Sequence, residues 1–244
     1  MSFETDGTQR QGIDLSKHNW AGKRPVDFEA VRREGVEFAI LRAGYGRYET
    51  QRDPYFERGH TGARAAGLAV GAYWYSYAVT PAEARKEARL FADAVRGGDW
   101  PMGLWFDQEY EPGILALTNA QRTEIVQAFC AEVQKRTGQV CGLYCSRDWI
   151  NTKLDADQLC GTPLWVAAYT GRDGPGRTAL PWTIWQYQGG SGRCPGVDGP
   201  VDRNICVCAA RQPPGGTLAA MTGLTGQDLR AVQHIIRALG GEAP

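Results

Sequence analysis

Two acidic residues at a spacing of two follow a short apolar run. Asp107 and Glu109 lie in "LWFDQE", residues 104–109. In a β-strand, residues two apart point to the same face, so their side chains converge while Gln108 points the other way. Close carboxylates disfavour each other's ionisation, so one can keep its proton near neutral pH and act as a general acid. Such a pair has the chemistry needed to cleave a glycosidic bond.

A lone Asp-x-Glu is a weak signal, and a solvated polar strand end is the alternative interpretation of this motif. Asp14 in "GIDLS" and Asp202 in "PVDRNIC" add two acids inside otherwise apolar strand patterns. An acid in such a strand is costly unless it is paired or used. The sequence therefore predicts a catalytic site made of Asp14, Asp107, Glu109 and Asp202. Glu111, beyond the strand, is interpreted as an ordinary loop charge.

Aromatic residues accompany the acids at strand positions. Tyr73 and Tyr75 share one face of "GAYWYS", and Trp74 takes the other. We expect the two tyrosines to face the site, where their hydroxyls can bond a sugar or a carboxylate, and Trp74 to pack beneath a helix. For any single aromatic, a place in the core is the alternative. The predicted substrate-binding residues are Tyr73, Tyr75, Tyr144, Trp165, Tyr169, Trp185 and Gln186.

The elements that must position these residues alternate along the chain. β-rich runs separated by helical patterns predict βα units and a parallel sheet. The helices thin out toward the end, so the pattern favours a modified (β/α) TIM-like barrel with a helix-poor second half over an open doubly wound sheet. In such barrels the chemistry lies at the carboxyl ends of the strands. The eight predicted strands are 12–16, 38–44, 69–78, 103–109, 141–146, 163–169, 182–188 and 201–206.

Three segments make up the predicted organisation. Residues 1–11 form an N-terminal extension, residues 12–211 the barrel, and residues 212–244 a linker with one amphipathic helix. A tail of this size cannot build its own core. We expect it to dock on the barrel or on a second copy, with a wall-binding module as the alternative.

Composition excludes several classes of partner. The 244-residue chain balances 27 Lys plus Arg against 27 Asp plus Glu, so no global basic field attracts nucleic acid. No apolar stretch of about 18 residues predicts a membrane span. The N-terminus lacks a basic segment followed by an apolar one, so we expect synthesis in the cytoplasm without a signal peptide.

Cysteine and histidine usage gives no metal or disulfide framework. Seven cysteines form an odd set without a CxxC pair, so reduced thiols are expected, with a bridge from Cys194 to Cys206 or Cys208 left open. Three histidines occur without an H-x-x-x-H pair, so no metal or other cofactor is predicted. A metal-dependent carbohydrate deacetylase using Asp14, Asp107 and His18 is a weakly supported alternative.

An ordered set of motifs runs from about Gly12 to Ala209: "GIDLSKHNW", "FAILRAGYG", "GAYWYSYA", "LWFDQE", "GLYCSRDWI", "LWVAAY", "IWQYQ" and "VDRN". Their combination resembles glycoside hydrolase family 25, the N-acetylmuramidases or Chalaropsis-type lysozymes of phage endolysins and bacterial autolysins. The resemblance implies a flattened (β/α) barrel that cleaves the β-1,4 bond between N-acetylmuramic acid and N-acetylglucosamine. It also implies bacterial peptidoglycan as the partner, and action at the cell wall after holin- or lysis-dependent release.

The resemblance also implies roles for the acids. Glu109 would protonate the leaving oxygen, and Asp107 would orient the 2-acetamido group of the substrate or assist a water. Asp14 and Asp202 would position the substrate and tune the acid pair. Retention and inversion both stay open, and a catalytically inactive cell-wall carbohydrate-binding module is an alternative function.

Overall fold

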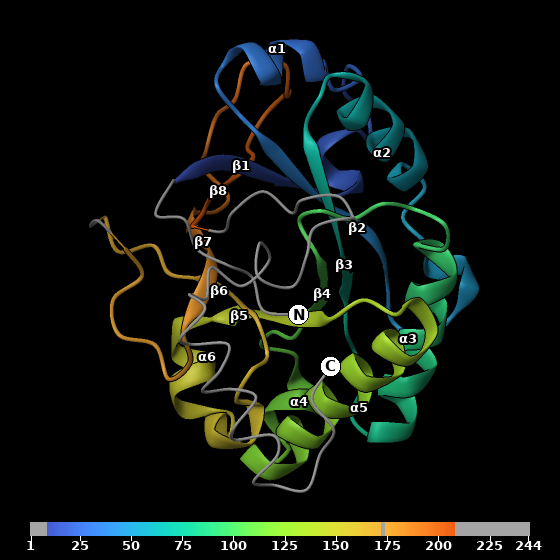
Figure 1. The fold of residues 1–244 in the computed structure, drawn as a ribbon, viewed down its shortest axis with the longest axis vertical. Helices are drawn as coiled ribbons and strands as arrows, with labels where there is room; N and C mark the ends of the chain where they lie inside the picture. The colour runs from blue at the N-terminus through green and yellow to red at the C-terminus, as the bar shows by residue number, and fades with distance from the viewer. Residues whose placement is uncertain (1–8, 172–173, 208–244) are drawn as a thin grey trace, which may run out of the picture. The chain divides into compact units, whose positions relative to one another are not determined.

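Eight strands form a closed barrel in chain order (Figure 1). The computed structural model describes residues 9–171 and 174–207, and the predicted tail helix lies outside them. The strands are β1 (Arg10–Leu15), β2 (Phe38–Tyr45), β3 (Ala69–Tyr75), β4 (Leu104–Asp107), β5 (Cys141–Ser146), β6 (Leu164–Ala167), β7 (Trp182–Gln188) and β8 (Asp202–Cys206). The predicted barrel with eight strands is therefore confirmed.

Helices cover the first two thirds of the barrel. Two long ones pack against each other on its outside, and in the described chain no helix follows residue 159, as the helix-poor second half predicts. The α-helices are α1 (Phe28–Arg33), α2 (Phe56–Ala65), α3 (Pro81–Ala94), α4 (Pro112–Leu115), α5 (Asn119–Thr137) and α6 (Arg147–Thr152). The 3₁₀ helices are η1 (Lys17–Asn19), η2 (Glu49–Gln51) and η3 (Ala156–Leu159).

The last strand departs from the prediction. Strands β1 to β7 pair with one another in parallel, whereas β8 runs antiparallel to both β7 and β1. The prediction of a parallel sheet is therefore wrong for β8. No helix separates β7 from β8, and an antiparallel return needs no crossover helix. As a result Asp202, the first residue of β8, lies opposite Asp14 in the backbone pairing of β8 with β1.

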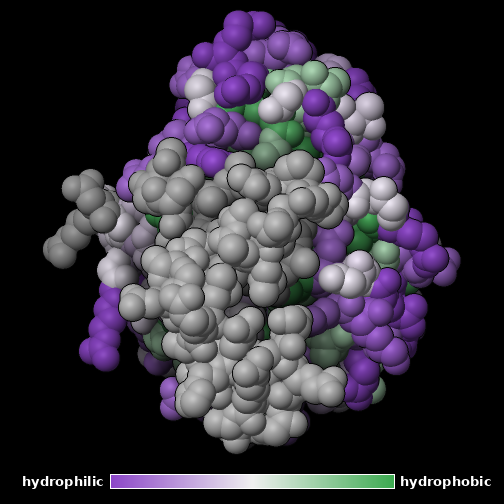
Figure 2. Space-filling model, viewed as in Figure 1, coloured by the Kyte–Doolittle hydropathy of each residue, from purple (hydrophilic) through white to green (hydrophobic). Residues whose placement is uncertain are grey.

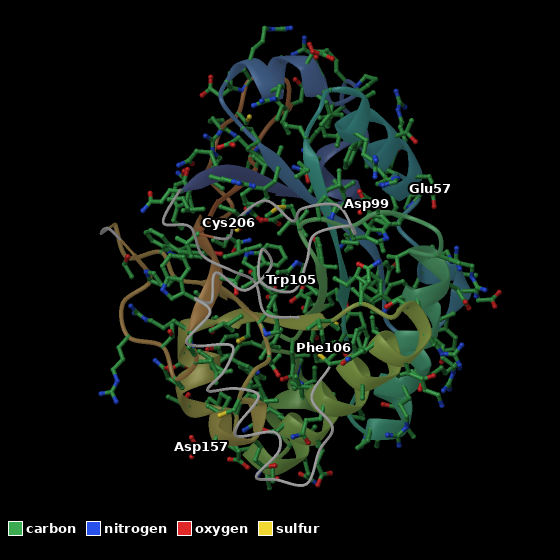
Figure 3. All side chains as sticks on the ribbon, in the orientation of Figure 1. Glu57, Asp99, Trp105, Phe106, Asp157 and Cys206 are labelled. Atoms are coloured by element: carbon green, nitrogen blue, oxygen red, sulfur yellow. The ribbon has the colours of Figure 1, made fainter. Side chains whose placement is uncertain are left out.

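Side-chain alternation separates the barrel interior from the layer beneath the helices. On β4, Trp105 points inward and lies 5.9 Å from the Trp165 ring, whereas Phe106 packs 4.3 Å from Phe129 of α5 (Figure 3). Trp74 of β3 packs outward against Phe91 of α3 at 6.0 Å, as expected. The interior is a packed core, so a substrate can reach only its end.

The outer surface of the described residues is mostly hydrophilic on the face shown, with small hydrophobic areas between (Figure 2). Within residues 9–171 and 174–207, none of the helices has the length and apolar character needed to span a bilayer. A polar surface and a packed apolar interior are the usual division in a globular protein.

Candidate active site

The four predicted acids lie together at the carboxyl end of the parallel strands. Asp14 comes from β1, Asp107 ends β4, Glu109 follows it, and Asp202 begins β8. Their charges act on one another: Asp202 and Glu109 both raise the pKa of Asp14, and Asp14 raises that of Asp107. The reversed direction of β8 brings Asp202 to this end, because a parallel strand would place its first residue at the opposite end.

Asp107 and Glu109 form a hydrogen-bonded carboxyl pair. Asp107 is only 3% exposed, and burial, followed by the charges of Glu109 and Asp14, raises its pKa well above the ordinary range. Burial also raises the pKa of half-buried Glu109, while its hydrogen bond with Asp107 opposes that rise. Because the pKa of each carboxyl is raised, the pair holds a proton at pH values where isolated carboxyls are ionised.

One oxygen of this pair lacks a partner. Asp107 Oδ1 is buried and accepts no hydrogen bond from any described residue. A buried acceptor without a donor is rare and costly in folded proteins. The site therefore contains an acceptor that a donor group on a substrate would satisfy.

Asp14 is held by amides rather than by a cation. Its Oδ2 accepts hydrogen bonds from Gln186 Nε2 at 2.9 Å and from Asn204 Nδ2 at 2.8 Å. Burial, followed by the charge of Asp202, raises the pKa of Asp14 to about 7, although the two amides oppose the rise. Two neutral donors fix the carboxylate in place without neutralising its charge.

Gln186 links Asp14 to two tyrosines. Its Oε1 accepts the hydroxyl of Tyr144 at 2.9 Å and that of Tyr169 at 2.7 Å, while its amide nitrogen donates to Asp14. Tyr144 is buried, whereas Tyr169 is 61% exposed at the rim. The two hydroxyl donors fix which end of the Gln186 amide faces Asp14.

Tyr75 makes a hydrogen bond to Glu111, an acid that was not predicted to belong to the site. The Tyr75 hydroxyl donates to Glu111 Oε1 at 2.6 Å, and the Glu111 backbone N–H donates to the Glu109 carbonyl at 2.9 Å. Glu111 is half-buried. Its interpretation as an ordinary loop charge is wrong, because it joins β3 to the segment that carries Glu109.

Both predicted tryptophans lie where a sugar cannot stack on them. Trp165 is 1% exposed, packs 4.4 Å from the Tyr144 ring and 5.9 Å from the Tyr73 ring, and donates to Asn204 Oδ1 at 2.8 Å. It therefore supports the floor of the site. Trp185 faces the outer core and donates to the Ala168 carbonyl at 2.8 Å. Its predicted place in the groove is wrong, since its neighbour Gln186 takes the inward position.

Arg42 is an inward-facing residue that the sequence reasoning missed. It follows Phe38 and Ile40 at a spacing of two on β2, so the alternation that identified the acids also pointed to it. Arg42 Nε pairs with buried Asp53 at 2.9 Å. Its positive charge opposes the rise in the pKa of Asp107.

The residues proposed for a metal site do not assemble into one. Within the described ranges no group of three or more His, Cys, Asp or Glu residues is arranged to hold a metal ion. His18 is exposed on η1. His60 is half-buried, with its ring 4.6 Å from the Trp100 ring. Cys194 carries a free thiol, so the bridge left open for it is not formed.

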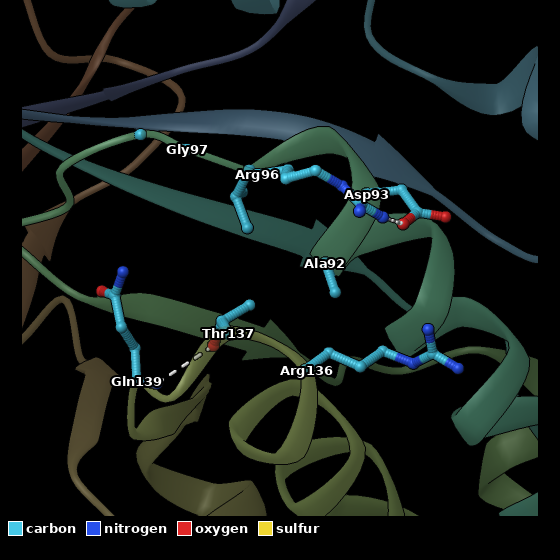
Figure 4. A pocket seen from close by; sticks show the side chains of 9 residues that line it. Ala92, Asp93, Arg96, Gly97, Arg136, Thr137 and Gln139 are labelled. Carbon is cyan, nitrogen blue, oxygen red and sulfur yellow. Dashed lines mark hydrogen bonds and ion pairs between the residues drawn. The ribbon is translucent and has the colours of Figure 1, made fainter.

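A separate pocket of about 390 Å³ lies between the carboxyl ends of α3 and α5 (Figure 4). These helix ends precede β4 and β5, so the pocket is at the opposite end of the barrel from the acids. Its two arginines already pair with Asp93 and Glu132. The lining residues are Ala92, Asp93, Val95, Arg96, Gly97, Gly98, Arg136, Thr137 and Gln139.

A closed α/β barrel with a buried, proton-holding carboxyl pair at its strand ends defines a glycosidase-type enzyme. The family model for glycosyl hydrolases family 25 matches residues 13–197, and the chain belongs to that family. It is a glycoside hydrolase.

Relatives and solved structures agree with this assignment. The chain is 29% identical to Lysozyme M1 of Streptomyces globisporus, over 82% of this chain and 68% of that protein. It is 28% identical to the autolytic lysozyme of Clostridium acetobutylicum, covering 94% of this chain and 65% of that protein. The crystal structure of the bacterial lysozyme from Streptomyces coelicolor superposes with a TM-score of 0.68 at 27% identity, covering 91% of this chain and all of that one.

Proposed function

We propose that this glycoside hydrolase is a peptidoglycan-hydrolysing N-acetylmuramidase that acts at the bacterial cell wall. The bond that it cuts would be the β-1,4 linkage from N-acetylmuramic acid to N-acetylglucosamine. The observation that carries the proposal is the hydrogen-bonded Asp107–Glu109 pair, which keeps a proton available at the open end of the barrel. The lysozymes among its relatives supply the substrate class.

Glu109 is the general acid in this proposal. It is less buried than Asp107 and lies beyond the strand end, where it can reach a leaving oxygen. Burial and the nearby charges of Glu111 and Asp202 raise its pKa, which favours the protonated form that a general acid needs. Asp14 and Asp202 position the substrate and tune this pair through their charges.

Asp107 orients the 2-acetamido group of the substrate in the same proposal. Its unpartnered Oδ1 is an acceptor suited to the amide N–H. Attack by the acetamido oxygen, with retention, is the proposed course, because Asp107 Oδ1 is available to hold the amide N–H of that group. NMR of the first-formed product should show the β-anomer, and an initial α-anomer would contradict the assignment.

Digestion of purified peptidoglycan with mass analysis of borohydride-reduced products tests the function. We expect new N-acetylmuramic acid reducing ends from the wild-type protein. Glu109→Gln should lose at least about a hundredfold, the usual contribution of a general acid. Glu111→Gln, two residues along and still able to accept from Tyr75, should lose less than about tenfold. N-acetylglucosamine ends, or undiminished activity of Glu109→Gln, would refute the proposal.

Several finer predictions accompany this function. Holin- or lysis-dependent release after cytoplasmic synthesis stays a prediction. Self-association or docking through the C-terminal helix also stays a prediction and concerns a segment outside the described residues. The domain boundaries at residues 11 and 211 also stay predictions.

A further inference from the structure

A row of tyrosine rings lies at the carboxyl ends of β3 and β2, next to the acid pair. Tyr75, bonded to Glu111, lies 5.3 Å from the Tyr77 ring. Tyr77 in turn meets Tyr45 edge to face at 6.3 Å. Tyr77 is 40% exposed, and Tyr75 and Tyr45 are half-buried. These ring-to-ring steps are comparable to the repeat of one sugar unit along a β-1,4-linked chain.

Two cations lie at the far end of this row. Lys17 Nζ is 5.3 Å from the Tyr45 ring centroid, and the Arg42 guanidinium is 5.5 Å from it. Arg42 is already paired with Asp53. The Lys17 ammonium has no carboxylate partner among the described residues, since Asp53 receives only the Lys17 backbone N–H, at 2.8 Å.

The positive charge here exceeds what the protein's own acids neutralise. After burial, the charges of Arg42 and Lys17 are the largest causes that lower the pKa of neighbouring His18, and Asp53 opposes them only in part. A half-buried ammonium without a partner beside an aromatic wall is a ready contact for an anionic ligand. The four-acid cluster at the other end of the row would repel the same anion.

We propose that Lys17, Tyr45 and Tyr77 form a subsite that binds a carboxylate-bearing substituent of the glycan strand, away from the bond that is cut. The inference rests on the proposed muramidase function and deepens it. The tyrosine rings offer faces and edges to successive sugar units, and Lys17 pairs with the carboxylate. In peptidoglycan, that carboxylate belongs to the peptide where one is attached, because the lactyl carboxyl of N-acetylmuramic acid is then an amide, and to the lactyl group itself where no peptide is attached.

A second lysine–tyrosine pair provides a matched control. Lys86 Nζ lies 5.3 Å from the Tyr48 ring centroid, the same separation as for Lys17 and Tyr45. Lys86 is exposed on α3, and Tyr48 is 58% exposed. Neither belongs to the row that leads to Glu111. A substitution there removes an equivalent cation–aromatic contact without touching the proposed subsite.

The test compares Lys17→Met and Lys86→Met on two substrates, native peptidoglycan and the same glycan with its carboxyl groups reduced to alcohols. On native substrate we expect Lys17→Met to raise KM about tenfold, the loss of one charged contact, with kcat nearly unchanged. On the reduced substrate Lys17→Met should match the wild type. Lys86→Met should match it on both.

A third substrate identifies the carboxylate. An amidase frees the glycan of its peptides and exposes the lactyl carboxylates, which are then the only carboxylates on the strand. If the KM increase for Lys17→Met persists on it, the subsite accepts the lactyl carboxylate, and if the increase disappears, the ligand is a carboxylate of the peptide. Either outcome supports the subsite.

Two results would overturn the subsite. One is an equal loss for Lys17→Met on native and reduced substrates, and the other is no loss on native peptidoglycan. Thermal unfolding of both variants checks that they fold. Failure of the proposed function would look different, because the wild type itself would then release no N-acetylmuramic acid reducing ends.

Discussion

At the scale of single residues, Asp202 acts on Glu109 through charge rather than contact. Asp202 accepts the Gly190 N–H at 2.7 Å, and its negative charge raises the pKa of Glu109. A general acid works while it is protonated, so a raised pKa extends activity to higher pH. Removing the charge of Asp202 must lower the pKa of Glu109, so activity should be lost at a lower pH.

Asp202→Asn should therefore move the alkaline limb of the kcat/KM profile to lower pH. Asparagine keeps an oxygen that can accept from Gly190, so the loop contact survives. Asp198→Asn serves as the control, because Asp198 lies in the loop just before β8 but pairs with exposed Arg24 at 2.7 Å. Profiles measured on soluble peptidoglycan fragments check this. An unmoved alkaline limb in Asp202→Asn would show that its charge does not reach the general acid.

Strand alternation made the acids predictable at this scale. Asp107 and Glu109 had to share a face, and the apolar neighbours of Asp14 marked it as unusual. The hydrogen bonds that Gln186 makes could not be predicted, because they join strands far apart in the chain. Trp185 was misplaced because alternation alone does not say which phase of a strand faces inward.

At the scale of elements, the segment after β4 depends on one buried arginine. Arg122 of α5 is 4% exposed, with Nη1 donating to three carbonyls at the end of α4 and just beyond it, and Nε donating to the Lys153 carbonyl at 2.7 Å. Its guanidinium also lies 5.5 Å from the Trp149 ring centroid, and Trp149 Nε1 donates to Gln108 Oε1 at 3.0 Å. Arg122 thus connects α4, α5 and α6 behind the residue between the two catalytic acids.

Arg122→Met should lower the free energy of unfolding by about 3 kcal/mol or more, because several buried carbonyls lose their donor. It should also lower kcat, since the segment that carries Glu109 loses its support. Arg136→Met, on the same helix, removes an exposed pair with Glu132 and should cost less than about 1 kcal/mol. Urea denaturation of both variants measures the difference. Equal costs would mean that Arg122 contributes no more than a surface charge.

The direction of β8 marks the limit of prediction at this scale. A strand has the same alternating pattern whichever way it runs, so the sequence located β8 without giving its direction. The missing helix before it was the available signal. The position of Asp202 depends on this direction, since only an antiparallel β8 places its first residue beside Asp14.

At the scale of the whole molecule, the barrel interior changes character along its axis. Phe38, Trp105 and Trp165 fill its lower part, which is the part of the interior below the site. The acids and amides occupy the end formed by the carboxyl ends of the parallel strands. The lower part is close-packed because glycines leave room for rings. A Cβ on Gly12 would lie 2.2 Å from the Phe38 ring, on the strand paired with it. The rigid floor beneath the site therefore depends on residues that never meet a substrate.

A double-mutant cycle tests this packing. Gly12→Ala should cost about 1–3 kcal/mol through overpacking. Adding Phe38→Leu makes room, so the double variant should be more stable than the sum of the single costs predicts, by about 1 kcal/mol or more. Phe91→Leu, in the outer core, should combine additively with Gly12→Ala. Denaturant unfolding gives all the free energies, and additivity in the Phe38 cycle would disprove the contact.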